Sequence, residues 1–344
     1  MANDSKRTRR CVALVALIAA AQILPAARTL AQPADLAPGG RIVRLDPALD
    51  ALVPRDAKIE KVAGGFGFTE GPVWLGNGRL AFSDVEGNAI FALAGDGSVS
   101  TIRKPSGYTG PPRPPGSRMG SNGLTLDREG RLLICEQGDR RVTRLEPDGS
   151  VTVLAERYDG KRLNSPNDIV VKSDGTIYFT DPPYGLATQR DDDPEKELDF
   201  NGVYRIVDGR VELLNDDLTR PNGLAFSPDE RYLYVANSDV ARRVWMRYPV
   251  ERDGTLGSGT VFYDITAEAL AGIPDGFKID NAGNLYGTGA GGVWIISPEG
   301  VALGRIEVPE VPANVGFGED GKTLFITART SIYRVRLAAA GRLP

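Results

Sequence analysis

The sequence contains 344 residues, carries a formal net charge of −4 and has no histidine. The missing histidines exclude a Ser–His or Cys–His catalytic pair and a histidine-ligated zinc, so hydrolytic chemistry would have to use carboxylates, Lys, Tyr or an oxygen-bound metal. The 41 glycines and 24 prolines are typical of a globular protein with many turns and short strands.

Residues 1–31 have the features of an export signal. The segment begins with the basic residues Lys6–Arg10, which are followed by the apolar stretch Cys11–Leu24. It ends with Thr29–Ala31, whose last residue is small and suits cleavage by signal peptidase. Two arginines directly before the apolar stretch also allow a twin-arginine signal. An N-terminal membrane anchor is the alternative, although the apolar stretch is short for one. We therefore predict a periplasmic or secreted protein from which this signal peptide is removed.

The charge of the remaining chain restricts the kinds of partner it could bind, and its cysteine content restricts its disulfides. The signal carries five positive charges and one negative charge, so its removal lowers the formal net charge from −4 to −8. An acidic chain without a basic stripe argues against nucleic acid as the partner. No later stretch has the length of apolar sequence that a membrane span needs. Cys135 becomes the only cysteine, which excludes an intramolecular disulfide, and we expect it to be a small buried side chain.

One unit is repeated along most of the chain. Residues 32–56 form a lead-in, rich in Pro and Ala, with a short strand expected at 41–45. Residues 57–340 then repeat a polar residue, a strand, a turn that usually contains Gly, and a second strand. The leading polar residues are Glu70, Asn122, Asn167, Asn222, Asp275 and Asn314. A period of about 50 residues, enough for four short strands, predicts one propeller blade per unit.

The predicted fold is therefore all-β, a six-bladed β-propeller with four-stranded blades. The last blade has too few residues after Arg336 for a fourth strand, so an N-terminal strand within 41–45 or 57–62 is expected to supply it and close the ring. Two segments interrupt the repeat. The Pro-rich segment 103–121 is either a lid over the channel mouth or a surface decoration, and 185–201 is expected to be a solvated acidic loop.

The leading polar position is expected to face the central channel, where the innermost strand of each blade begins. Asn and Asp also cap turns, which alone would explain most of the recurrence. Turn capping does not explain the change to Glu at 70 and Asp at 275, so we favour a ligand role for Glu70 and Asp275. Two carboxylates with amide oxygens favour Ca²⁺, with Mg²⁺, Mn²⁺ or Zn²⁺ as alternatives, although the lack of His and of paired Cys speaks against zinc.

Five sequence segments resemble one known family, that of senescence marker protein, gluconolactonase and luciferin-regenerating enzyme. In chain order they are Thr69–Trp74 (TEGPVW), Arg162–Asp168 (RLNSPND), Phe179–Gly185 (FTDPPYG), Arg220–Leu224 (RPNGL) and Ile273–Gly276 (IPDG). The resemblance runs from about residue 60 to 336, and within the family the chain is most similar to the bacterial, exported gluconolactonases.

The resemblance implies a six-bladed propeller with one divalent metal, usually Ca²⁺, in its channel. The family's metal-binding positions match, in chain order, Glu70, Asn167, Asn222 and Asp275. The resemblance also assigns Asp275 the role of general base. Asn122 falls where the family contacts substrate hydroxyls, and Glu136 falls near another such contact. Many relatives carry His where this chain has Gln137, which puts a proton-transfer role of that position in doubt.

The leading hypothesis is hydrolysis of an aldonolactone, with D-glucono-1,5-lactone as the first substrate to consider. The metal would polarise the lactone carbonyl, and Asp275 would take a proton from the attacking water. One alternative is hydrolysis of another lactone, or of an organophosphate-type ester, at the same calcium site. Another is a non-catalytic calcium-binding propeller that serves as an interaction platform. The expected partner is a small-molecule lactone, with neither nucleic acid nor a membrane involved.

Overall fold

The computed structural model describes Met1 and residues 39–344 apart from position 115. The predicted signal peptide and the first part of the lead-in lie outside these residues. The described chain is built almost entirely of strands, with a single short 3₁₀-helix, η1 (Pro47–Ala51). Within that part, no helix has the length and apolar character needed to cross a bilayer.

Six antiparallel sheets each contribute four strands in the same order. The first strands are β3 (Thr69–Trp74), β7 (Ser121–Leu126), β13 (Ile169–Val171), β17 (Pro221–Phe226), β21 (Phe277–Ile279) and β25 (Pro312–Gly318). The second strands are β4 (Arg79–Asp84), β8 (Leu132–Glu136), β14 (Ile177–Asp181), β18 (Tyr232–Asn237), β22 (Leu285–Gly289) and β26 (Thr323–Ala328). The third strands are β5 (Ala89–Ala94), β9 (Arg141–Leu145), β15 (Gly202–Val207), β19 (Val244–Pro249), β23 (Gly292–Ile296) and β27 (Ser331–Arg336). The fourth strands are β6 (Val99–Arg103), β10 (Val151–Ala155), β16 (Arg210–Asn215), β20 (Thr260–Asp264), β24 (Ala302–Glu307) and β2 (Ile59–Gly64).

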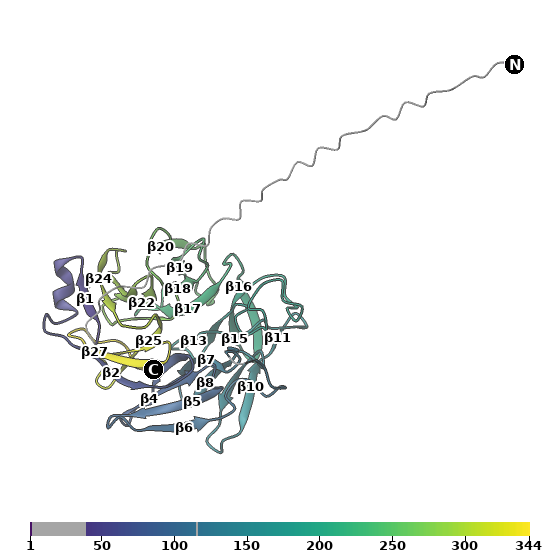
Figure 1. Cartoon of the computed structure of the whole chain (residues 1–344), viewed down its shortest axis with the longest axis horizontal. Helices are drawn as coiled ribbons and strands as arrows, with labels where there is room; N and C mark the ends of the chain where they lie inside the picture. Colours follow the sequence, from purple (N-terminus) through teal and green to yellow (C-terminus); the bar gives the residue numbers. More distant parts are fainter. Residues whose placement is uncertain (2–38, 115) are drawn as a thin grey trace. The chain divides into compact units, whose positions relative to one another are not determined.

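The first strands form the inner ring of the molecule. Each contacts the first strand of the sheet before it and of the sheet after it, and β25 returns to β3. Figure 1 shows β7, β13, β17 and β25 gathered around the centre, with later strands such as β6, β10 and β16 towards the outside. This arrangement confirms the predicted six-bladed β-propeller.

The N-terminal segment closes the circle of six blades. β2 pairs antiparallel with β27, with Ile59 opposite Val335, and so becomes the fourth strand of the last blade. The prediction of a closing N-terminal strand is confirmed, because β2 lies at the second of the two expected places. The short strand expected in the lead-in is β1 (Arg41–Arg44), which pairs with β24 as a fifth strand of the fifth blade.

The apolar core is divided into six main clusters, each lying between two neighbouring blades. Val73 and Ala81 of the first blade, for example, pack against Leu124 and Ile134 of the second. This division follows from the pleat of each strand, because alternate side chains point to the two faces of a blade and each face meets another blade. Cys135 is buried and unpaired in the core between the second and third blades, as predicted.

The two segments that interrupt the repeat contact one another. Arg113 of the Pro-rich segment lies 3.5 Å from a carboxylate oxygen of Glu195 in the acidic loop. A guanidinium nitrogen of Arg140 donates a 2.7 Å hydrogen bond to the backbone carbonyl of Glu195. A small hairpin, β11 (Arg157–Tyr158) with β12 (Lys161–Arg162), adjoins them in the link to the third blade. The two segments therefore border a common polar cavity.

The acidic loop is less solvated than predicted. Asp193 is only 4% exposed and accepts hydrogen bonds from the backbone and the hydroxyl of Thr188. Asp191 forms an ion pair with Arg220, and Asp192 remains exposed beside Arg190. The three consecutive aspartates therefore have three different environments, which composition alone does not distinguish.

Candidate active site in the central channel

The six leading polar residues lie at the same end of the six inner strands. Glu70, Asn122 and Asn222 are the second residues of their strands, and Asn314 is the third residue of β25. Asn167 and Asp275 each precede the first residue of their strand by two positions. Five of the six residues are buried, and Asp275 is partly exposed. The repeat therefore brings the six residues together as one group around the channel, which we call the ring.

A glycine directly after the polar residue lets neighbouring blades approach closely in four of the six units. These glycines are Gly71, Gly123, Gly223 and Gly276. A Cβ atom added to Gly71 would lie 2.2 Å from the backbone oxygen of Asn122, and one added to Gly276 would lie 1.8 Å from the side chain of Asn314. The polar residue and its glycine thus act as a pair, in which the glycine allows the next blade to place its own polar residue beside the first.

The third blade departs from this pairing, because Asp168 follows Asn167 where four other blades have glycine. Asp168 is 2% exposed, and its Oδ1 accepts a 2.9 Å hydrogen bond from the backbone of Ile169. Its Oδ2 is buried and accepts no hydrogen bond from any described residue. Burial raises the pKa of Asp168, and the nearby Lys278 opposes that increase. Sequence reasoning missed this carboxylate, although the exception to the Gly rule was a visible signal.

Glu70 is held by one backbone and one side-chain donor. Its Oε2 accepts hydrogen bonds of 3.0 Å from the backbone of Gly71 and from the amide nitrogen of Asn314. The oxygen of that Asn314 amide accepts from the backbone of Val315, so Asn314 presents a donor to Glu70. Burial raises the pKa of Glu70 to about 7, against the lowering effect of these two hydrogen bonds.

Asp275, which is partly exposed, completes a group of three carboxylates with the buried Glu70 and Asp168. Burial raises its pKa well above the ordinary value, and the negative charges of Glu70 and Asp168 raise it further. Arg118 and the amide of Asn222 act in the opposite direction. A carboxylate with a raised pKa is a stronger base than an ordinary aspartate, and a cation bound beside it would offset that increase.

The ring fits a divalent cation. None of the three carboxylates has a Lys or Arg nitrogen within ion-pair distance among the described residues, and one oxygen of Asp168 is buried without a partner. Buried anions without a counter-charge are costly, and a bound cation would remove that cost. Carboxylate and amide oxygens are the ligands that calcium prefers. No group of three or more His, Cys, Asp or Glu side chains with ligating geometry occurs in the described chain, so amide oxygens would have to share in binding.

Gln137 connects two asparagines of the ring. Its Oε1 accepts hydrogen bonds of 3.3 Å from the amide nitrogens of Asn122 and Asn167. Its Nε2 donates a 3.3 Å hydrogen bond to the backbone carbonyl of Arg118 in the Pro-rich segment. Gln137 is 1% exposed, so this network lies within the protein.

Glu136 is not brought together with the carboxylates of the ring. Its two oxygens accept hydrogen bonds from Arg103, Arg141 and Thr143, at 2.5, 2.6 and 2.8 Å. The carboxylate is fully buried among these partners. Its assignment as a substrate contact stays a prediction, and a sugar hydroxyl would have to compete with two arginines for it.

Arg118 links the Pro-rich segment to the ring electrostatically. Its guanidinium carbon lies 3.8 Å from the centre of the Phe68 ring, and its Nε lies 3.6 Å from a carboxylate oxygen of Glu86. Phe68 precedes β3, which carries Glu70, and the charge of Arg118 lowers the pKa of Asp275. The Pro-rich segment therefore contributes a cation beside the ring, which supports a role beyond decoration.

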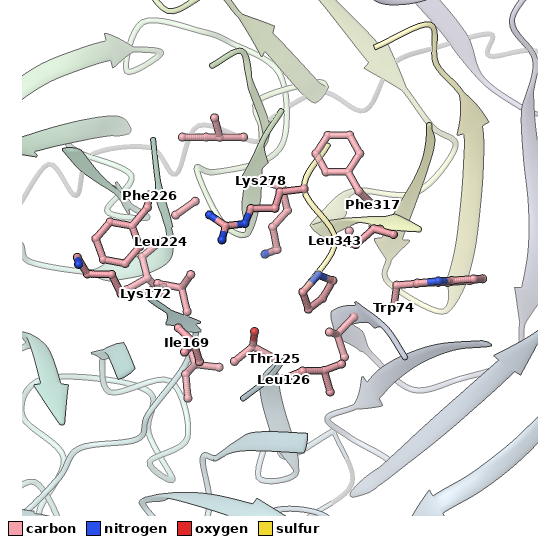
Figure 2. Close-up of a pocket in the computed structure, with 18 of the residues that line it drawn as sticks. Trp74, Thr125, Leu126, Ile169, Lys172, Leu224, Phe226, Lys278, Phe317 and Leu343 are labelled. Carbon is pink, nitrogen blue, oxygen red and sulfur yellow. The ribbon is translucent and has the colours of Figure 1, made fainter. Parts of the chain in front are cut away.

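A cavity of about 680 Å³ occupies another part of the same channel. It is lined by the later halves of the inner strands and by the C-terminal residues Leu343 and Pro344, whereas none of the six polar residues lines it. Figure 2 shows Lys278 among the side chains that surround it, with Leu224 and Phe317 from neighbouring inner strands. Apolar side chains make up much of its wall, together with charged ones such as Lys172, Lys278 and Asp280.

Comparison with known proteins agrees with this geometry. The sequence profile of the SMP-30/Gluconolactonase/LRE-like region matches residues 68–330. A gluconolactonase of Zymomonas mobilis is 40% identical over 341 residues, which cover 96% of this chain and 95% of that protein. A 6-deoxy-6-sulfogluconolactonase of Pseudomonas putida is 37% identical over 75% of this chain and 82% of that protein.

Solved structures are similar as well. The structure of a gluconolactonase from Xanthomonas campestris has a TM-score of 0.75 and 33% sequence identity. The match covers 89% of this chain and 97% of that one. On the extent of the profile match and of these similarities, the chain belongs to the SMP-30/gluconolactonase/LRE-like family.

Proposed function

We propose that this protein is a metal-dependent lactone hydrolase and that D-glucono-1,5-lactone is its leading substrate. The observation that carries the proposal is the ring of mostly buried carboxylates and amides, whose negative charge has no counter-charge within ion-pair distance in the described chain. The gluconolactonases among its relatives support lactones as the substrate class.

The metal would be held by four residues of the ring, Glu70, Asn167, Asn222 and Asp275. Two carboxylates and two amide oxygens favour Ca²⁺ over the smaller Mg²⁺, which demands stricter geometry. When bound, such an ion supplies Lewis acidity, which stabilises negative charge that develops on a carbonyl oxygen. The carboxylate of Asp168 adds negative charge to the same region and so favours a cation there.

The protein's own residues would then carry the proton and orient the sugar. Asp275 would accept a proton from the attacking water at its carboxylate. Asn122 lies in the ring with its amide nitrogen bound to Gln137, which leaves its oxygen for a hydroxyl of the substrate. Burial excludes most bulk water from these groups and strengthens their electrostatic effect.

A comparison of substrate classes tests the proposal. Purified protein with Ca²⁺ would be assayed under matched conditions with D-glucono-1,5-lactone, other aldonolactones, simple lactones and an organofluorophosphate. We expect the highest kcat/KM with an aldonolactone, after subtraction of spontaneous hydrolysis. A higher kcat/KM with the organophosphate, or turnover of none of these compounds, would contradict the proposed function.

A further inference from the structure

Gln137 joins two neighbouring blades at the ring through a single atom. Its Oε1 accepts from Asn122, which belongs to the same blade, and from Asn167 at the start of the next blade. Each of these distances is 3.3 Å. Gln137 directly follows β8, which ends at Glu136, so the second strand of the second blade fixes its position.

The orientation of the Gln137 amide is set by the third member of the network. A backbone carbonyl can only accept a hydrogen bond, so the carbonyl of Arg118 requires the Nε2 end of Gln137 to face it. The Oε1 end must then face the two asparagines. An amide oxygen can only accept, so both asparagines must turn their nitrogens towards Gln137.

The consequence lies at the other end of the two asparagine amides. With their nitrogens directed at Gln137, the oxygens of Asn122 and Asn167 are the groups that remain for other partners. Among the described residues, neither oxygen accepts a hydrogen bond, and neither is a buried atom without a partner. Both oxygens are therefore available to a ligand in the ring.

We propose that Gln137 is a positioning residue that directs the amide oxygens of Asn122 and Asn167 into the ring. This inference rests on the proposed function, in which Asn167 binds the metal and Asn122 a substrate hydroxyl. The Pro-rich segment takes part in this positioning, because the backbone carbonyl of Arg118 within that segment orients Gln137. A glutamine amide does not ionise near neutral pH, so this orientation is the same in acid and in base.

Two substitutions separate this role from simple packing. Gln137→Met keeps a flexible side chain of similar length but removes the strong acceptor, which frees both asparagines to rotate. Gln137→His keeps an acceptor only while the imidazole is neutral, and protonation below about pH 6.5 converts that nitrogen into a donor. The matched control is Asn284→Leu, which removes a buried amide bonded to Asp280 at the opposite end of β21 from Asp275.

The experiment measures the calcium dissociation constant of the metal-depleted proteins by isothermal titration calorimetry, with kcat, KM and Tm determined in parallel. We expect Gln137→Met to weaken Ca²⁺ binding by about tenfold or more, the range found when a residue that orients a metal ligand is lost. KM for the lactone should also rise. Asn284→Leu should lower Tm to a similar extent and leave the calcium affinity unchanged.

A second readout does not require the Met variant to fold. The ratio of the Gln137→His to the wild-type dissociation constant should increase as the pH falls from 8 to 5.5. Wild-type calcium affinity and KM in Gln137→Met, or a ratio for Gln137→His that stays constant with pH, would overturn the positioning role. Wild-type protein that binds Ca²⁺ but hydrolyses no lactone would contradict the proposed function alone. Wild-type protein that binds no Ca²⁺ would overturn both.

Discussion

From the repeat alone, a functional role could be predicted for single residues of the ring only where the residue type departs from asparagine. Asparagine at the leading position is compatible with turn capping, whereas the change to Glu at 70 and Asp at 275 indicated another role. In the structure Glu70 is buried, Asp275 is partly exposed, and the pKa values of both carboxyl groups are raised. Asp168 was missed because it stands at the position of a packing glycine, and its proximity to Glu70 and Asp275 depends on how the blades meet.

Glu70 should make the stability of the metal-free protein fall as the pH rises. Its pKa is about 7 in the folded chain and has an ordinary value of 4.5, so between these values only the unfolded chain loses the proton. The penalty is absent below pH 4.5 and complete above pH 7. Replacing Glu70 by Gln removes it. We therefore expect the Tm of Glu70→Gln, relative to wild type in EDTA, to increase by about 2 °C per pH unit in this window.

Thermal unfolding of both proteins at pH 5, 6, 7 and 8 checks this expectation. In excess Ca²⁺ the order should reverse at pH 8, because the wild-type carboxylate gains a bound cation and the amide variant does not. A difference in Tm that is independent of pH in EDTA would contradict the raised pKa of Glu70.

At the scale of the strand, the sequence predicted the inner strands and the closing strand from their pattern. Each inner strand has its polar residue at or near its start and ends before a turn that usually contains Gly, which is a local signal. The pairing of β1 with the fifth blade was not predictable, because a four-residue strand carries no information about its partner. The contact between residues 103–121 and the acidic loop depends on long-range ion pairing, which composition does not reveal.

The close approach of neighbouring inner strands can be tested at Gly276. An added Cβ would lie 1.8 Å from Asn314, the residue that donates a hydrogen bond to Glu70. We expect Gly276→Ala to lower the free energy of unfolding by about 1–3 kcal/mol, as overpacking usually does. The matched control is Gly95→Ala, where nothing lies within 4 Å of the added atom. Urea denaturation giving equal stabilities for the two variants would show that the blades yield without cost.

Ring closure by β2 makes a second prediction about elements. A variant without residues 2–38 keeps β1 and β2 and serves as the reference. A variant without residues 2–64 loses β1 and β2 and leaves β27 as an open edge. We expect it to unfold at a much lower temperature and without a single cooperative transition. Calorimetry that finds equal Tm values for the two variants would contradict closure by β2.

At the scale of the whole molecule, a repeat of one local pattern produced both the fold and the location of the ring. Six copies place six polar residues at one end of the inner strands, and five of these residues are buried. The number of blades was predictable because each copy carries its own signal. The electrostatic state of the ring was not, because it depends on burial and on Lys278 and Arg118, which lie outside the repeated position.

Metal-dependent hydrolysis at the ring is the central claim. The most direct measurement follows acid release from D-glucono-1,5-lactone by wild type, Asp275→Asn and Asp280→Asn, each treated with EDTA and then supplied with Ca²⁺. Asp280 is the matched control, because it is buried at the other end of β21 and its carboxylate accepts hydrogen bonds from its own turn and from Tyr286. After correction for spontaneous hydrolysis, we expect Ca²⁺ to restore turnover to wild type and Asp280→Asn. Asp275→Asn should stay at least about a hundredfold slower. Full turnover in EDTA, or an Asp275→Asn variant as fast as wild type, would contradict the claim.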